Sequence, residues 1–297
     1  MPIHIETSDP TLSDFWQITA SELQLQLDES GEKMILIQHS GSLKIVKTPT
    51  STTIFYQEKA HLFRALVLWV TQPEATYTFE EQPQFKEIGP MIDLSRNAVL
   101  TIAQAKRFIL LCGKMGLNTC LLYMEDTYEI PEFPYFGYLR GRYTQEQLQE
   151  LDQYAQAIGI ELVPAIQTLA HLTNPLKWGF AKDMKDTSDI LLVDAPKTYQ
   201  FIEAALTSIQ QSFSTDKIHI GMDEAHQLGK GTYFEEHGPE DRFSIMTKHL
   251  QKVVAICNKL SLKPMMWSDM FFRLGSKTGD YYDLNVDFPE DLPQQIP

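Results

Sequence analysis

Hydrophobic and polar residues follow two different patterns along this chain, and the change falls near residue 86. In the first part, strict alternation over Leu23–Leu27 predicts a half-buried strand. Two further apolar runs, Ile35–Ile37 and Leu43–Val46, lie on either side of the turn-forming residues Ser40–Ser42. Because short apolar runs divided by a turn signal are typical of consecutive hairpins, we expect these strands to form a meander.

A helix is predicted to follow these strands. Apolar residues within Lys59–Val70 recur at the three- and four-residue spacing of one helix face. A sheet followed by a helix that covers one of its faces is typical of a small α+β domain, which we place at residues 1–85. The polar segment Glu80–Gln84, which contains a proline, is predicted to be the linker that leaves this domain.

From residue 86 onward, short apolar runs alternate with longer amphipathic stretches. This alternation predicts successive strands and helices, and therefore a parallel sheet. The predicted strands are Met91–Ser95, Leu117–Met124, Ile160–Ile166, Ile218–Met222 and Lys263–Trp267. The predicted helices are Ala103–Met115, Thr144–Ile158, Pro196–Ser212 and Phe243–Leu260.

The junctions between these helices and strands favour a (β/α) barrel. Gly116 and Gly159 end two of the predicted helices, and Ser261 takes the same place after the last one, so we expect a left-handed helix cap at each. Links from helix to strand are short, whereas links from strand to helix are long and polar, as in barrels whose site is built by the strand-to-helix loops. A doubly wound sheet remains the alternative, although no glycine-rich phosphate loop follows the first strand.

The predicted barrel has about five of its eight strand–helix units. A complete barrel needs about 250 residues, and about 210 follow residue 86. Residues Tyr281–Pro297 are rich in Asp, Pro and Gln and are predicted to form no further helix. We therefore expect an α/β fold in which residues 86–297 form an incomplete (β/α)8-type TIM barrel that carries the catalytic site. It is expected to be a fragment, or to be completed by something outside this sequence.

Composition narrows the range of partners. The chain has 39 acidic and 25 basic residues, a net charge of −14 and no basic tract, so we do not expect a nucleic-acid partner. No apolar run approaches the roughly 18 residues of a membrane span, and the first residues lack the basic and apolar regions of a signal peptide. Cys112, Cys120 and Cys257 are expected to be reduced thiols. We expect a soluble, cytoplasmic protein without a membrane partner; the oligomeric state stays open.

Charged, imidazole and indole side chains recur at the carboxyl ends of the predicted strands, where a barrel enzyme keeps its catalytic groups. Singly, each has a structural explanation, such as an ion pair between Asp93 and Arg96 or helix capping by Asp223 and Glu224. Their recurrence at one end of successive strands favours a functional site. The candidates are Asp93, Arg96, Glu125, Asp126, Gln167, His171, Asp223, Glu224, His226, Trp267 and Asp269.

Two chemistries compete for these residues. One is metal-dependent hydrolysis with His171, His219, Asp223 and His226 as ligands, but their spacing lacks the His-Glu-x-x-His zinc pattern, so no metal or other cofactor is expected. The other is glycoside hydrolysis, in which a carboxyl group protonates the leaving oxygen and a second carboxylate stabilises positive charge. Asp223 beside Glu224 in a partly apolar pocket would raise the pKa of the acid.

The segment His219–Glu224 reads His-Ile-Gly-Met-Asp-Glu and resembles the His-x-Gly-x-Asp-Glu signature of glycoside hydrolase family 20, the β-N-acetylhexosaminidases. Other parts of the sequence agree with this resemblance. The first predicted strand ends in Asp93–Arg96, the second in Glu125–Asp126 and the fifth in Trp267, and the third is followed by His171. A small α+β domain ahead of the barrel is also the family's usual arrangement. The resemblance implies an exo-acting enzyme that removes terminal β-linked GlcNAc or GalNAc from an oligosaccharide or glycoconjugate.

The resemblance also implies substrate-assisted catalysis. The substrate's own 2-acetamido oxygen would attack the anomeric carbon and give an oxazolinium ion, while Glu224 protonates the leaving oxygen and later activates water. Asp223 would hold the acetamido N–H and stabilise the positive charge. Arg96 would bind the outer hydroxyls of the sugar, and Trp267 would line the acetamido pocket. The remaining substrate-binding candidates are Glu125, Asp126, His171 and Asp269; which of Glu125 and Asp126 matches the family's second-strand aspartate is left open.

One departure from the family pattern keeps alternatives open. The family normally adds a tyrosine and further tryptophans from barrel strands six to eight, and in the predicted barrel those strands would lie beyond Pro297. A pocket without them would be open on one side. A non-catalytic sugar-binding barrel is therefore the first alternative to the hydrolase, and a metal-dependent barrel hydrolase is the second.

Overall fold

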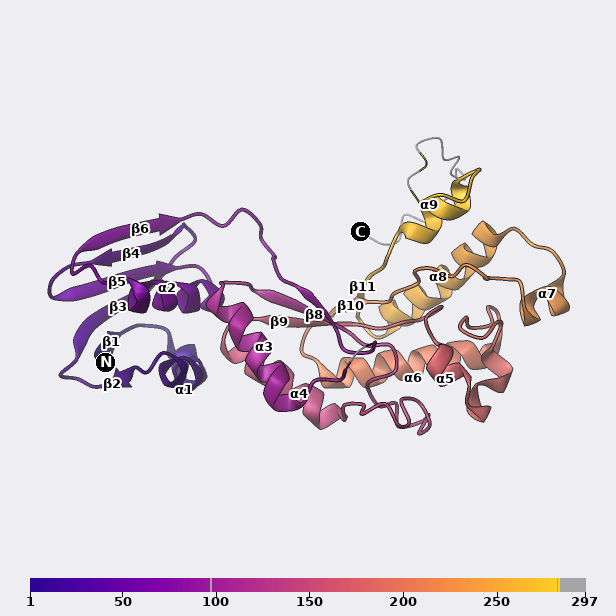
Figure 1. The fold of residues 1–297 in the computed structure, drawn as a ribbon, viewed down its shortest axis with the longest axis horizontal. Coiled ribbons are helices and arrows are strands. Elements are labelled where there is room, and N and C mark those ends of the chain that lie inside the picture. Colours follow the sequence, from indigo (N-terminus) through magenta and orange to yellow (C-terminus); the bar gives the residue numbers. More distant parts are fainter. Residues whose placement is uncertain (97, 282, 284–297) are drawn as a thin grey trace. The chain divides into compact units, whose positions relative to one another are not determined.

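The computed structural model describes residues 1–96, 98–281 and 283, and its strands form two separate sheets (Figure 1). Residues 1–91, 100–121 and 150–162 form one compact unit. Residues 92–99, 122–149 and those from 163 onward form the other. Three segments of the expected barrel, residues 86–91, 100–121 and 150–162, are thus grouped with the N-terminal residues. The domain boundary placed between residues 85 and 86 stays a prediction.

The first sheet has six strands in the order β2-β1-β3-β5-β4-β6. Its strands are β1 (Pro2–Glu6), β2 (Gln26–Leu27), β3 (Glu32–Gln38), β4 (Leu43–Lys47), β5 (Ser51–Tyr56) and β6 (Tyr77–Glu81), and its helices are η1 (Pro10–Leu12), α1 (Ser13–Glu22) and α2 (Lys59–Thr71). The predicted helix Lys59–Val70 is confirmed by α2. The predicted linker is wrong at its start, because Glu80 and Glu81 belong to β6.

The predicted meander is wrong. β3 pairs in parallel with β5, and β4 pairs antiparallel with β5 and β6, so β3 and β4 are not neighbours. The turn signal between the two strands is present, but it cannot reveal that a later strand lies between them. That strand, Ser51–Tyr56, alternates between buried and partly exposed residues and has a strand pattern of its own.

The strand predicted at Leu23–Leu27 is also largely wrong, because the first half of this segment forms the cap that follows α1. The N–H of Leu23 bonds to the carbonyl of Thr19, and the N–H of Leu25 bonds to the carbonyl of Ala20. Gln24 between them has φ of 55°, so the segment forms a left-handed helix cap rather than extended chain. Only Gln26–Leu27 forms a strand.

The second sheet has five strands in the order β11-β10-β9-β8-β7, and helices separate them along the chain (Figure 1). The strands are β7 (Met91–Asp93), β8 (Thr119–Tyr123), β9 (Glu161–Ala165), β10 (Lys217–His219) and β11 (Lys263–Met265). The helices are α3 (Ile102–Lys114), α4 (Gln145–Ala157), α5 (Thr173–Leu176), η2 (Gly179–Met184), α6 (Pro196–Ser212), α7 (Thr232–His237), α8 (Arg242–Lys259) and α9 (Asp269–Gly275). The alternation of strands and helices is confirmed; α5, α7, α9 and η2 were not predicted.

The predicted left-handed caps are present at all three junctions. Gly116, Gly159 and Ser261 have φ of 79°, 83° and 57°. In each case the next residue's N–H reaches back five positions, as in the bond from Leu117 to the carbonyl of Cys112. This bonding closes the helix and aims the chain into the next strand. The repeated cap explains why the links from helix to strand are short.

The strand predicted at Ile218–Met222 is too long. Regular strand geometry ends at His219, because Gly221 and Met222 take φ of 71° and 73°. Left-handed backbone is incompatible with a continuing strand, so the chain turns here and carries the next two residues out of the sheet.

Three remaining expectations concern burial and the end of the chain. All three cysteines are buried and free, as expected for reduced core thiols. Among the described residues, no helix has both the length and the apolar character needed to cross a bilayer. The prediction that residues 281–297 form no helix falls, apart from Tyr281 and Asp283, outside the described residues.

Candidate active site

The chain leaves β10 through a run of unusual backbone that places the two adjacent carboxylates. Gly221 is required there, because a Cβ atom would lie 2.2 Å from Oε1 of Gln167. The same Oε1 atom accepts a hydrogen bond of 3.3 Å from the N–H of Met222. Glu224 is also left-handed, with φ of 50°, which is uncommon for a residue with a side chain. The position of the pair is therefore set by strained backbone that a neighbouring side chain holds.

Asp223 is the enclosed member of the pair. Its Oδ1 accepts a hydrogen bond of 2.8 Å from Nε2 of Gln167, and its Oδ2 lies 3.2 Å from Nε2 of His171. Burial alone would raise the pKa of Asp223, but the contacts with His171 and Gln167 outweigh it and hold that pKa below its ordinary value. The carboxylate is therefore kept ionised.

His171 lies between the two carboxylates. Its Nε2 is 3.4 Å from Oε2 of Glu224 as well as 3.2 Å from Asp223, and it is aligned for a hydrogen bond with neither. Contact with Asp223 raises the pKa of His171, and burial partly opposes this. His171 itself has φ of 57°, so the backbone of the loop after β9 is also strained where it meets the pair.

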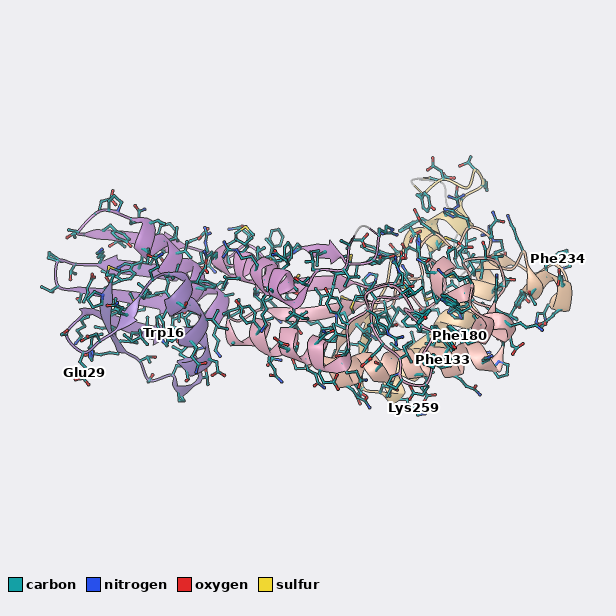
Figure 2. The ribbon with its side chains drawn as sticks, turned by 60° about the horizontal axis from the view of Figure 1, so that its bottom comes forward. Trp16, Glu29, Phe133, Phe180, Phe234 and Lys259 are labelled. Carbon is teal, nitrogen blue, oxygen red and sulfur yellow. The ribbon has the colours of Figure 1, made fainter. Side chains whose placement is uncertain are left out.

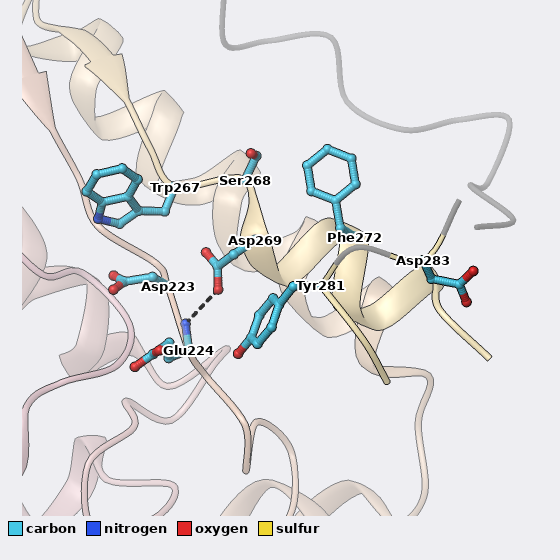
Figure 3. Close-up of a pocket in the computed structure, with 8 residues that line it drawn as sticks. All are labelled: Asp223, Glu224, Trp267, Ser268, Asp269, Phe272, Tyr281 and Asp283. Carbon is cyan, nitrogen blue, oxygen red and sulfur yellow. Dashed lines mark hydrogen bonds between the residues drawn. The ribbon is translucent and has the colours of Figure 1, made fainter. Parts of the chain in front are cut away.

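Glu224 is the open member of the pair. Its side chain is 55% exposed, compared with 17% for Asp223, so the partly apolar enclosure expected around the acid is not formed by the described residues. Its backbone N–H donates to Oδ2 of Asp269 at 3.1 Å (Figure 3). Asp269 begins α9, and its other oxygen is buried without a hydrogen-bond partner among the described residues. Burial raises the pKa of Asp269.

A chain of polar contacts connects the pair to the ends of β7 and β8. Nε2 of Gln167 also donates to the hydroxyl of Tyr123 at 3.1 Å, and that hydroxyl donates to Oε1 of Glu125 at 3.0 Å. Arg96 lies over the Tyr123 ring, with its Nη2 3.4 Å from Oε1 of Glu125. Tyr123 was missed from the sequence, although its place at the end of a predicted strand was a usable signal.

Two of the predicted acids have other partners. Asp93 accepts from the guanidinium of Arg96 at 3.0 Å and from the N–H of Ser95, so it orients the arginine. Asp126 is almost fully buried and binds Nε of Arg140 at 2.8 Å. The structure therefore brings Glu125, rather than Asp126, into the polar chain that leads to the carboxylate pair.

A pocket of about 690 Å³ opens beside the carboxylates, and α9 forms one of its walls (Figure 3). Trp267 is 40% exposed, and its ring lies against the ring of His219 at 4.7 Å between centroids. The indole thus offers one flat face to the pocket. The lining residues are Asp223, Glu224, Trp267, Ser268, Asp269, Phe272, Tyr281 and Asp283.

The histidines that the metal alternative would use point to different surroundings. His219 is buried beneath Trp267, and burial lowers its pKa to about 4. The ring of His226 faces the hydroxyl of Tyr281, with Nε2 at 3.3 Å. Within the part of the chain that the structure describes, no three His, Cys, Asp or Glu side chains converge as a metal site would require.

The segment after Glu224 is held by a residue that the sequence did not suggest. Arg242, at the start of α8, donates to the carbonyls of Ala225, His226 and Leu228 at 2.8 to 3.2 Å. Three bonds from one guanidinium fix the loop immediately beyond the acid. No local signal distinguishes such an arginine from a solvated one, because its partners are backbone carbonyls.

The contact between Asp223 and His171 predicts a pH window for its contribution to stability. Asp223 has a folded pKa below its ordinary 3.8, so its contribution is present above that value and is lost as the pH falls through the folded pKa. His171 has a folded pKa above its ordinary 6.5, so its contribution is present below that value and is lost as the pH rises through the folded pKa. The contribution is therefore largest between about pH 4 and pH 6.5.

Calorimetry of the protein and of His171→Asn from pH 3 to pH 9 tests this window. Asparagine tolerates the left-handed backbone, so the variant removes the charge with little added strain. We expect the wild type to gain on the order of 1 kcal/mol over the variant inside the window and less on either side. A difference in stability that does not vary with pH would contradict the assignment.

Known proteins resemble this chain in sequence and in fold. The sequence matches the model of the glycosyl hydrolase family 20 catalytic domain over residues 85–282, more than half of the chain. A Beta-hexosaminidase of Vibrio furnissii is 25% identical over an alignment of 182 residues that covers 49% of this chain and 30% of that protein. Hexosaminidase D of Bos taurus is 23% identical over an alignment of 170 residues that covers 52% of this chain and 48% of that protein.

A solved structure matches over nearly all of the chain. It is the GH20 exo β-N-acetylglucosaminidase from Vibrio harveyi in complex with N-acetylglucosamine, with a TM-score of 0.74 and 21% identity over 90% of this chain and 51% of that one. This likeness confirms the predicted fold class: part of a TIM barrel, preceded by an N-terminal α+β region. The chain spans about half the length of these proteins, or less.

Proposed function

The chain belongs to glycosyl hydrolase family 20, and from this premise we propose that the protein is an exo-acting β-N-acetylhexosaminidase. The proposed substrate is an oligosaccharide or glycoconjugate that ends in β-linked GlcNAc or GalNAc. The relatives named beta-hexosaminidase and hexosaminidase D support this class of reaction. The observation that carries the proposal is the adjacent pair Asp223 and Glu224 beside an open pocket, with His171 3.2 Å and 3.4 Å from their carboxylates.

In the first step, the 2-acetamido oxygen of the bound sugar attacks the anomeric carbon as the bond to the leaving oxygen breaks. Glu224 gives its proton to that oxygen, and the sugar becomes an oxazolinium ion. Asp223 accepts the acetamido N–H and faces the positive charge that develops on the acetamido group. Its lowered pKa favours this role, because a carboxylate held ionised before the reaction needs no reorganisation when the charge appears.

In the second step, Glu224 acts as a base. It takes a proton from water, the water oxygen attacks the anomeric carbon, and the oxazolinium ring opens to give the free sugar with the acetamido group restored. The exposure of Glu224 suits both steps, since the leaving group departs and water arrives on the same open side. The enzyme needs no nucleophile of its own, which explains how two neighbouring residues can supply both carboxylates.

The other side chains fit binding of the sugar. Trp267 offers a flat indole face on which the apolar side of the acetamido group can lie. Arg96 is half-exposed and is oriented by Asp93 and Glu125, so its guanidinium can bind sugar hydroxyls. Gln167 and Tyr123 connect this arginine to Asp223.

The proposal is tested by hydrolysis of the 4-nitrophenyl β-glycoside of GlcNAc by the full-length protein. Release of nitrophenol is expected, together with competitive inhibition by a thiazoline that mimics the oxazolinium ion. The matched control is the 4-nitrophenyl β-glucoside, whose 2-hydroxyl cannot act as the internal nucleophile, and it should not be cleaved. Equal cleavage of the two glycosides would contradict substrate assistance, and saccharide binding without turnover would favour the non-catalytic alternative.

A further inference from the structure

Exposed aromatic side chains gather on the two loops that follow β8 and β9. Tyr135 and Tyr138, in the loop after β8, are 54% and 45% exposed. Both lie against Trp178 of the loop after β9, with ring centroids 6.2 Å and 5.4 Å apart. We call these three residues the aromatic surface. Large aromatic rings left in water are costly, so their grouping indicates a surface that binds something.

The aromatic surface belongs to loops whose ends are packed together. Phe133 and Phe180, which come from the same two loops, lie 5.8 Å apart between ring centroids (Figure 2). Phe133 also packs edge-on against Phe201 of α6 at 5.3 Å. Because neighbouring side chains of both loops are joined in this way, the exposed rings are held on a preformed support and lose little freedom on binding.

A pocket of about 580 Å³ adjoins the aromatic surface through Trp178. We call it the lysine pocket, because Lys177, Lys182 and Lys185 line it. No described carboxylate lies within ion-pair distance of any of these lysines, although the chain carries a net charge of −14. Three lysines against one carboxylate in the lining leave an excess of positive charge, which favours the binding of an anion.

One carboxylate, that of Asp186, also lines the lysine pocket, but its oxygens are occupied. Its Oδ1 accepts from the N–H groups of Gly231 and Tyr233 at 3.1 Å and 2.9 Å, and its Oδ2 accepts from Gly229 at 2.9 Å. Asp186 therefore fastens the segment that leads into α7. Ser188 and Thr232 also line the pocket, and their hydroxyls are neutral donors for an anion, whereas the hydroxyl of Thr187 donates to Asp189 at 3.0 Å.

The lysine pocket and the carboxylate pair are connected through one loop. The loop after β9 carries His171, which contacts Asp223 and Glu224, and then Lys177 six positions later. Both loops leave the carboxyl ends of their strands, the edge of the sheet at which the pair lies. In an exo-acting enzyme, everything beyond the terminal sugar is part of the leaving group.

We propose that the aromatic surface and the lysine pocket together bind an anionic sugar, one that carries sulfate or carboxylate, in the leaving-group part of the glycan. The assignment to the leaving group rests on the proposed function. The flat faces of Tyr135 and Tyr138 suit sugar rings, and the lysines supply the charge that selects an anionic unit over a neutral one. An acidic peptide would use the lysines but would leave the aromatic surface without a role.

Binding to the full-length protein is measured by calorimetry with three tetrasaccharides: chondroitin 6-sulfate, which carries sulfate and carboxylate, hyaluronan, which carries carboxylate alone, and neutral chitotetraose. We expect both anionic tetrasaccharides to bind more tightly than chitotetraose, with an advantage that shrinks as salt screens the lysines. A larger advantage for the sulfated tetrasaccharide than for hyaluronan would identify sulfate as the preferred group, and equal advantages would identify carboxylate as sufficient.

Substitutions then separate the two parts of the surface. The double variant Lys182→Gln/Lys185→Gln is expected to weaken binding of the anionic tetrasaccharides by about 5-fold or more and to leave chitotetraose binding unchanged. Tyr135→Ala should weaken all three. The matched control is Lys33→Gln/Lys44→Gln, which removes the same charge from exposed ion pairs of the first sheet and should change nothing.

Equal affinity for charged and neutral tetrasaccharides, or no effect of the double lysine variant, would overturn the proposal. Tighter binding of an acidic hexapeptide than of any tetrasaccharide would overturn the assignment to a sugar. The double lysine variant should cleave the aryl glycoside at the wild-type rate, because that substrate has no sugar beyond the terminal one. Failure of the wild type to cleave the aryl glycoside would count against the proposed function, while these binding results would still decide what the surface binds.

Discussion

Glu224→Gln is expected to lower kcat for the β-glycoside of GlcNAc by about 10²- to 10⁴-fold, the range over which one general acid–base group acts. Glutamine has the same shape but cannot give a proton to the leaving oxygen or take one from water. The left-handed backbone and the bond from the N–H of residue 224 to Asp269 do not depend on the side chain, so the fold and the pocket should be retained. Steady-state kinetics on the 4-nitrophenyl glycoside measure the loss.

Two comparisons make this result specific to proton transfer. A substrate with a better leaving group, such as the 2,4-dinitrophenyl glycoside, should lose less in the first step, because its leaving oxygen needs no proton. Glu235→Gln, which changes an exposed glutamate of α7, is the matched control and should leave the rate unchanged. Wild-type turnover by Glu224→Gln would remove this residue from the mechanism.

Asp223→Asn is expected to lower kcat by roughly 10²-fold or more, the typical cost of removing one preorganised group that stabilises charge in a transition state. Asparagine at this position keeps the size of the side chain and lacks its charge, so the oxazolinium ion would form without a counter-charge. The loss should also lower the pKa of His171, whose rise depends chiefly on contact with the Asp223 carboxylate. Steady-state kinetics and the affinity for the thiazoline inhibitor measure the loss of charge stabilisation.

The loss should appear mainly in kcat and in thiazoline affinity, and less in KM, because the neutral substrate gains little from the negative charge of Asp223 before the reaction. Asp126→Asn is the contrasting variant, because Asp126 is bound to Arg140 and does not contact Asp223 or Glu224. It should lower the melting temperature and leave the affinity for the thiazoline inhibitor largely unchanged. Equal thiazoline affinity for the wild type and Asp223→Asn would rule out the proposed role of the charge.

The parts of the fold that could be predicted from the sequence are those set by local patterns. The helix Pro196–Ser212 begins at a proline and was predicted with its observed bounds, and the caps at Gly116 and Gly159 follow from the residue types there. The order of strands in the first sheet could not be predicted, because the pairing of β3 with β5 joins segments through contacts that leave no mark on either.

The site divides in the same way. The position of Asp223 and Glu224 at a strand end was visible in the sequence, whereas their role in the chemistry stays a prediction. The different surroundings of Glu125 and Asp126 were not visible in the sequence. They depend on Tyr123, which binds Glu125, and on Arg140, which binds Asp126. Residues that act by bonding backbone, such as Arg242, were missed because any surface arginine looks the same in a sequence.

The bond from Glu224 to Asp269 has a consequence for the order in which the protein is assembled. The six-residue signature from His219 to Glu224 is synthesised as one piece, but the group that holds the N–H of Glu224 lies 45 residues later, after α8 and β11. A ribosome-bound chain that ends before Asp269 would therefore contain the whole signature without the bond that holds its acid. We therefore expect Glu224, the proposed acid, to acquire this backbone contact only once a later strand–helix unit has been made and has docked.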